Sequence, residues 1–193
     1  MDRYVEITEK IREFTESSVK KTRYEHSVRV AQMCARICRF YSLDAEKGYL
    51  AGIGHDMCKE FPVDEMLFLA SKDGDDIIDF ERNKPSLLHG RAAAVLMQRD
   101  FGISDKDILE AVAVHTSGKS GMCALAKALF IADKIEPGRP QATEKYIAQK
   151  FSLSFDGMFY AVLKENYDYL TKKGYLVFPG TEKLLEEYRV EGV

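Results

Sequence analysis

Hydrophobic and polar residues recur along most of this chain with the period of an α-helix, in which positions three or four apart share a face. The clearest example lies between Val19 and Tyr41, where apolar positions fall on one face and arginines fall elsewhere. That face comprises His26, Val30, Met33, Cys34, Ile37 and Tyr41. No segment alternates with the period of two that a half-buried strand shows. The pattern therefore predicts an all-α protein.

Capping residues and prolines mark where these helices begin and end. Asp44 is the predicted N-cap of a helix that runs to about His55. Ser104, three residues before Asp107, resembles a capping box at the start of a helix that ends near Val114. The chain is predicted to turn at 85–90 and to break at 137–140. Further helices are predicted at about 62–73, 92–101, 122–133, 152–173 and 181–189.

Length and composition suit one compact domain. The chain has 193 residues, of which 46% are hydrophobic, and it contains no repeat, linker or low-complexity tract. We therefore expect a single domain over residues 1–193, with the stretch after Pro140 as a C-terminal helical extension. The net charge of −3 gives no reason to expect a nucleic-acid partner.

The compartment is predicted to be the cytoplasm. The first ten residues, MDRYVEITEK, include three acidic side chains and no apolar run, unlike a signal peptide. No stretch reaches the roughly 18 apolar residues that a membrane span needs, so no membrane partner is expected. The four cysteines contain no C-x-x-C pair and are interpreted as reduced core thiols.

All four histidines of the sequence occupy notable positions. His26 lies on the apolar face described above, and His89 and His115 are in phase with apolar neighbours in their own helices. His55 ends an apolar helix and is followed directly by Asp56. Any one of them, taken alone, is more often a hydrogen-bonded core residue than a ligand.

Asp133 is less easily explained as an ordinary core or surface residue. It shares a face with apolar residues of a helix that looks buried, and an unpaired buried carboxylate costs several kcal/mol. A cation should therefore meet it: a metal, a protonated histidine, or one of Lys59, Lys134 and Arg139. The alternative is an exposed aspartate at the helix end before Pro137.

The histidines and aspartates together favour a metal, because imidazole and carboxylate form a mixed shell suited to first-row ions. Adjacent residues of a regular helix point about 100° apart, so His55 and Asp56 could share an ion only near a helix end. Gly52 and Gly54 make such an end plausible. Without a thiol cluster, a structural zinc site is not expected.

These residues resemble the H…HD…D signature of the HD superfamily of metal-dependent phosphohydrolases. The motifs HDMCK (55–59), LHG (88–90), HTSGKSGM (115–122) and ADKIEPGRP (132–140) narrow the resemblance to the YqeK subfamily, which are bacterial symmetrical diadenosine tetraphosphate hydrolases. The resemblance spans about residues 24–139. It implies a helical HD core at about 20–140, followed by C-terminal helices at about 141–193.

The resemblance also implies an activity and a ligand set. The enzyme would cleave diadenosine tetraphosphate at its centre to two ADP, by attack of a water that the metal activates. The metal is implied to be iron, with manganese or cobalt as other divalent candidates. Its ligands would be His26, His55, Asp56 and Asp133, and His89 with His115 could hold a second ion.

Substrate contacts are expected from residues near these ligands. Lys59 lies one helical turn beyond His55 and could neutralise phosphate or act in catalysis with Asp56 and His115, although it could equally be a solvated lysine. Arg139 suits bidentate phosphate binding. His89, His115 and Thr116 complete the expected substrate-binding set. The glycines of the 116–121 loop would let its backbone approach phosphate, although simple turn geometry explains them equally well.

Two other functions remain open from the sequence. The same metal cage could serve a (deoxy)nucleotide phosphatase or an alarmone or cyclic-nucleotide phosphodiesterase. Alternatively, the chain could be a catalytically idle helical module that senses a nucleotide or scaffolds a partner. The expected substrate is a small nucleotide, and the chain could form a homodimer.

Overall fold

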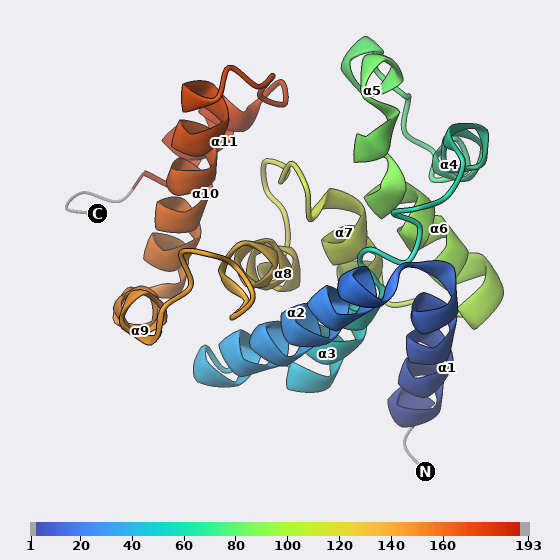
Figure 1. Ribbon diagram of the computed structural model, residues 1–193, viewed down its shortest axis with the longest axis horizontal. Helices are drawn as coiled ribbons and strands as arrows, with labels where there is room; N and C mark the ends of the chain where they lie inside the picture. The colour runs from blue at the N-terminus through green and yellow to red at the C-terminus, as the bar shows by residue number, and fades with distance from the viewer. Residues whose placement is uncertain (1–2, 190–193) are drawn as a thin grey trace.

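The computed structural model describes residues 3–189, and within that range all regular structure is helical (Figure 1). The predicted all-α class is therefore confirmed. The elements in chain order are α1 (Arg3–Ser18), α2 (Lys21–Phe40), α3 (Ala45–Gly54), α4 (Val63–Ala70), α5 (Asp79–Asn83), the 3₁₀ turn η1 (Pro85–Leu87), α6 (His89–Phe101), α7 (Lys106–Val114), α8 (Ala124–Ile135), α9 (Glu144–Phe151), α10 (Phe155–Lys172) and α11 (Thr181–Glu187).

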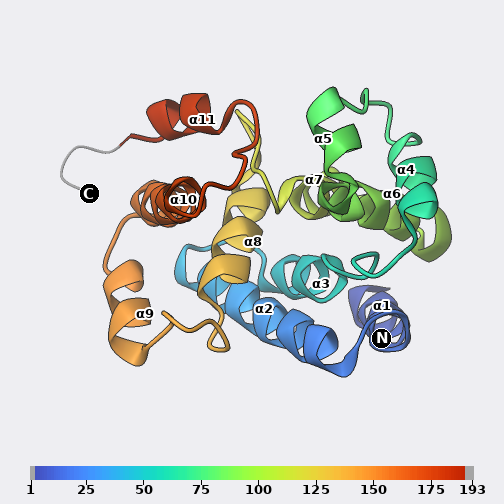
Figure 2. The same ribbon diagram turned by 45° about the horizontal axis from the view of Figure 1, so that its top comes forward.

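Helices α2, α3, α7 and α8 form the centre of the molecule. Helix α2 packs along α3 and against α8, and α7 packs against α3 and α8. Helices α1, α4 and α6 cover one side of this group, whereas α10 packs on α8 from the other side and is accompanied by α9 and α11 (Figures 1 and 2). Helix α8 thus lies between the other three central helices and the C-terminal helices, as Figure 2 shows.

The capping predictions were confirmed at one helix and wrong at another. The Asp44 side chain accepts hydrogen bonds from the backbone N–H groups of Glu46 and Lys47, as an N-cap should. Helix α7, however, is capped by Asp105 instead of Ser104, because the Asp105 carboxylate reaches the first free N–H groups of that helix.

Other elements also differ from the predictions. Helix α6 begins at His89, inside the predicted turn, and α5 and α9 were not predicted because each has only one or two turns of pattern. Over residues 3–189, the structure contains no helix with the length and apolar character needed to cross a membrane.

Gly52 allows the close approach of α2 and α3. A Cβ atom at this position would lie 2.5 Å from Ala31 Cα and 2.8 Å from Ala31 N, which are backbone atoms that cannot move aside. We therefore expect Gly52→Ala to lower the free energy of unfolding by about 3 kcal/mol, in the manner of an overpacked core. Urea denaturation would measure the change.

A matched control is Gly102→Ala, where φ is +67° and no atom lies within 4 Å of the added Cβ. That variant should lose only about 1 kcal/mol, from the left-handed backbone conformation alone. If both variants lost the same amount, close packing at Gly52 would not be the reason for the glycine.

Candidate metal centre

The fold brings the four histidines and two aspartates to one region. His26 lies within α2, His55 is the C-cap of α3, His89 is the first residue of α6, and His115 is the C-cap of α7. All four side chains are buried. Asp56 follows directly after α3 and is 3% exposed, and Asp133 lies in the last turns of α8.

Each histidine holds its Nδ1 atom against an acceptor. The Nδ1 atoms of His55, His89 and His115 lie 2.7 Å from the carbonyl oxygens of Gly52, Ser86 and Val112, respectively. His26 Nδ1 lies 3.1 Å from a carboxylate oxygen of Glu136. An acceptor at Nδ1 keeps the ring proton there, so that Nε2 carries a free lone pair.

A first set of ligand atoms gathers around His26 and His55. The Nε2 atoms of these residues lie 3.8 and 3.6 Å from Asp56 Oδ2, respectively. Asp133 Oδ1 adjoins them, at 3.1 Å from His26 Nε2 and 3.9 Å from His55 Nε2. The four residues expected to form the metal site thus lie together, and His55 and Asp56 meet beyond the last residue of α3, as the sequence required.

A second set lies on the other oxygen of Asp56. His89 Nε2 is 2.9 Å from Asp56 Oδ1, His115 Nε2 is 3.8 Å from the same oxygen, and the two Nε2 atoms are 3.1 Å apart. Asp56 therefore stands between both sets and belongs to each.

This arrangement fits a metal ion. The Nε2 atoms of His26 and His55 are buried and make no hydrogen bond. Burial lowers the pKa of His55 to about 3 and that of His89 to about 4, so both rings are neutral near pH 7. Lone pairs that converge on one carboxylate repel each other unless a cation lies among them. The donor set is therefore suited to a divalent transition metal.

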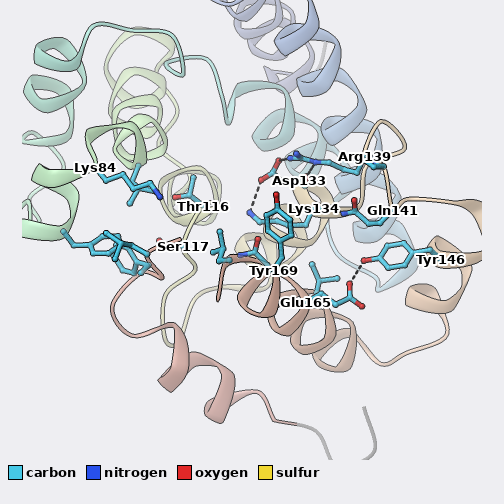
Figure 3. Close-up of a pocket in the computed structure, with 18 residues that line it drawn as sticks. Lys84, Thr116, Ser117, Asp133, Lys134, Arg139, Gln141, Tyr146, Glu165 and Tyr169 are labelled. Carbon is cyan, nitrogen blue, oxygen red and sulfur yellow. Dashed lines mark hydrogen bonds and ion pairs between the residues drawn. The ribbon is translucent and has the colours of Figure 1, made fainter. Parts of the chain in front are cut away.

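Asp133 is mostly buried and does meet cations, as the sequence analysis required. Lys134 Nζ lies 2.9 Å from one carboxylate oxygen, and the Arg139 guanidinium lies 2.6 Å from the other (Figure 3). Burial alone would raise the pKa of Asp133, but Lys134 and the neighbouring His26 outweigh it and hold the pKa well below its usual range. Lys59 lies elsewhere, with Nζ 3.2 Å from His89 Nε2.

Two further residues of the site were not identified from the sequence. Arg23 forms an ion pair of 2.9 Å with Asp56, and its side chain is about one-third exposed. Glu136 is buried and contacts His26. Arg23 lies in a short basic segment, residues 20–29, in which no position stands out from the others. Glu136 is one of several charged residues in the ADKIEPGRP motif, and its spacing does not distinguish it.

A cavity of about 810 Å³ opens beside Asp133, between the central helices and the C-terminal ones (Figure 3). Thr116 and Arg139, both expected substrate contacts, line it, as do Lys84 and Lys134. Helices α9 and α10, together with the loop between α10 and α11, add a largely aromatic and apolar wall. Lys59, His89 and His115 are not part of its lining and lie around Asp56 instead.

The loop at 116–121 reaches the cavity and is tied to the C-terminal helices. Gly118 and Gly121 have φ values near +70°, which only glycine adopts at little cost. Ser120 Oγ and the Gly121 N–H both donate to the Glu187 carboxylate of α11. The glycines thus serve the turn, and the loop position depends on α11.

Comparison with known proteins adds three findings. Residues 23–138 match the HD domain family. The chain is 31% identical over 184 residues to the symmetrical bis(5'-nucleosyl)-tetraphosphatase of Staphylococcus aureus, and the aligned region covers 93% of both proteins. It is 32% identical over 159 residues to the enzyme of the same name from Bacillus subtilis, where the aligned region covers 82% of this chain and 85% of the relative. A crystal structure of a predicted HD superfamily hydrolase involved in NAD metabolism from Clostridium acetobutylicum superposes with a TM-score of 0.84 at 27% identity, covering 93% and 95%.

Proposed function

The chain belongs to the HD domain family, and on this premise we propose that it hydrolyses diadenosine tetraphosphate symmetrically to two ADP. The observation that carries the proposal is the convergence of buried imidazole nitrogens and carboxylates beside a cavity that is lined by cations. The proposed metal ligands are His26, His55, Asp56 and Asp133.

The proposed metal is iron, with manganese and cobalt as alternatives, because neutral imidazoles and carboxylates suit these ions. When bound, such an ion supplies a Lewis acid that polarises a phosphoryl oxygen and lowers the pKa of a coordinated water. His89 and His115 contribute a second donor set around Asp56, which could take a second ion or contact phosphate.

The side chains around the ligands would bind and neutralise the phosphate chain. Arg139 and Lys134 line the cavity within contact distance of Asp133, and Thr116 offers a hydroxyl from the 116–121 loop. Phosphoryl transfer depends mainly on positioning and on neutralising charge, so these cations would set which phosphorus lies beside the metal ligands. Lys59 contacts His89 on the opposite side of Asp56 and would supply positive charge there.

The C-terminal helices would hold a nucleoside. Tyr169 of α10 and Phe178 of the following loop line the cavity and offer aromatic surface on which a purine can stack. A cavity of about 810 Å³ lies within the range of small-molecule sites, which is about 300–1,000 Å³. We therefore propose that residues 1–193 act as one functional unit, because the segment after 140 supplies one wall of the site.

The test is a product analysis on protein purified without chelator. We expect close to one transition-metal ion per chain by elemental analysis, with ADP as the sole nucleotide product from diadenosine tetraphosphate. In water labelled with ¹⁸O, one of the two ADP molecules should carry the label. A shift of the reacting groups by about 1 Å can cost a hundredfold in rate. A site that places an inner phosphorus beside the activated water should therefore not produce AMP and ATP.

Three outcomes would contradict the proposal in different ways. AMP plus ATP as main products would mean asymmetrical attack. Hydrolysis of mononucleotides alone would keep the metal site but assign another substrate. Nucleotide binding without turnover, in metal-loaded protein, would indicate a sensor.

A further inference from the structure

His26 differs from the other three histidines in what holds its ring. His55, His89 and His115 each direct Nδ1 to the carbonyl oxygen of the residue three positions earlier, a neutral acceptor in their own chain segment. His26 Nδ1 instead faces the Glu136 carboxylate, which lies 110 residues away in sequence. His26 is therefore the one of these four rings whose Nδ1 faces a carboxylate, and that carboxylate comes from the end of a different helix.

The position of His26 explains this difference. His55 and His115 follow the last residues of α3 and α7, and His89 begins α6, so carbonyls near them are not all used by helical hydrogen bonds. His26 lies inside α2, where the carbonyls of the preceding turn already accept helical hydrogen bonds. Its Nδ1 consequently needs a partner from a neighbouring element.

The Glu136 carboxylate is held in one orientation by its other contacts. One oxygen, Oε2, accepts from Arg29 Nε at 2.6 Å and from the backbone N–H of Gly138 at 2.5 Å. The other oxygen, Oε1, faces His26 Nδ1 at 3.1 Å. The side chain is 2% exposed, so water cannot easily replace these partners. Arg139 Nε is also near Oε1, at 3.9 Å, which is beyond hydrogen-bond distance. The two oxygens therefore have different hydrogen-bond partners.

Gly138 keeps this cluster compact. A Cβ atom there would lie 2.6 Å from the Arg29 guanidinium, which shows how closely the 136–138 backbone wraps around the Arg29 and Glu136 pair. Glu136 is also the C-cap of α8, only three residues beyond Asp133. The same helix end therefore supplies one proposed metal ligand and the partner of another.

We propose that Glu136 is a positioning residue for the metal site, an inference that rests on the metal site of the proposed function. Asp133 Oδ1 lies 3.1 Å from Nε2, as close as Glu136 Oε1 lies to Nδ1, so the two carboxylates compete for the ring proton. Glu136 would hold the proton on Nδ1, which leaves the Nε2 lone pair for the metal. Carboxylates behind ligating histidines fix the tautomer and the ring orientation, and their loss typically weakens metal affinity by about 10–100-fold.

Glu136→Gln gives a sharp test because it is nearly isosteric. The two donors at the Oε2 position, Arg29 and Gly138, would keep the amide oxygen on their side. The amide NH₂ would then face His26 Nδ1 and donate to it, which moves the ring proton to Nε2. A protonated Nε2 cannot bind a metal.

Two measurements follow. ¹⁵N NMR of the metal-free protein at alkaline pH, where the ring is neutral, should show His26 protonated on Nδ1 in the wild type and on Nε2 in Glu136→Gln. Competition with a chelator for Mn²⁺ or Co²⁺ should show about 10–100-fold weaker binding by the variant.

Two variants serve as controls. Arg29→Gln removes the charged donor to Glu136 Oε2 but leaves the Gly138 N–H and the contact with His26. Glu81→Gln removes another buried carboxylate that accepts from an arginine, Arg91. Both should keep His26 protonated on Nδ1. If Arg29→Gln weakened metal binding as much as Glu136→Gln and neither changed the tautomer, Glu136 would be only an ion-pair residue.

The outcome for Glu136 can be separated from that for the proposed function. A wild-type protein with His26 protonated on Nε2 would overturn the inference, whether or not the variant folds. Wild-type protein that bound metal and formed ADP, with unchanged affinity in folded Glu136→Gln, would also overturn it while leaving the function intact. Failure of the wild type to bind any metal would instead refute the proposed function.

Discussion

Asp56→Ala is expected to lower hydrolysis of diadenosine tetraphosphate by at least about a thousandfold, because Asp56 belongs to both donor sets of the site. One carboxylate oxygen faces His26 and His55, and the other faces His89 and His115. Its loss removes a ligand and the negative charge at the same time. Metal catalysis supplies several kcal/mol of transition-state stabilisation, and about 1.4 kcal/mol corresponds to each tenfold in rate.

The measurement is steady-state ADP release, together with circular dichroism and metal content. Helix content should be retained, since Asp56 lies beyond the last residue of α3 and contributes no apolar packing to the core. Arg23→Gln is the matched control, because it breaks the 2.9 Å ion pair with Asp56 but leaves the carboxylate in place. That variant should keep its metal. Near-normal turnover in folded Asp56→Ala would contradict the assignment.

The sequence was sufficient to predict most of the helices and the residues that meet at the site. Helical spacing placed His26 on the buried face of α2, and that prediction was confirmed because α2 packs against both α3 and α8. The adjacent pair His55 and Asp56 required a helix end, and α3 ends at Gly54. In these cases, local periodicity and helix ends were enough to predict where a side chain points.

Other features depend on contacts between distant segments, which periodicity does not describe. Glu136 contacts His26 across 110 positions, and nothing in its own helix distinguishes it from an ordinary charged C-cap. The aromatic wall of the cavity arises because α10 packs on α8, which no local pattern indicates. The predicted N-cap of α7 was wrong by one residue. Ser104 and Asp105 are both residue types that cap helices well, and the ion pair between Asp105 and Lys47 favours Asp105.

His115→Ala is expected to separate the two donor sets. The ring lies 3.8 Å from Asp56 Oδ1 and 3.1 Å from His89 Nε2, whereas the first set lies on the opposite oxygen of Asp56. The variant should therefore keep about one tightly bound metal per chain. It should nevertheless lose about 100–1,000-fold in turnover, the usual cost of removing one preorganised group that stabilises a transition state.

Metal content by elemental analysis and turnover on the same preparation would check this expectation. His55→Ala is the matched comparison, since His55 is also a buried helix C-cap whose Nδ1 donates to a carbonyl three residues earlier. That variant should lose the metal as well as the activity, because its Nε2 faces Asp56 Oδ2 in the first set. If His115→Ala also lost all its metal, the two sets would form a single cooperative site. Retained metal with lost turnover would instead assign His115 to the phosphate chain or to a weaker second ion, as its position beyond Asp56 indicates.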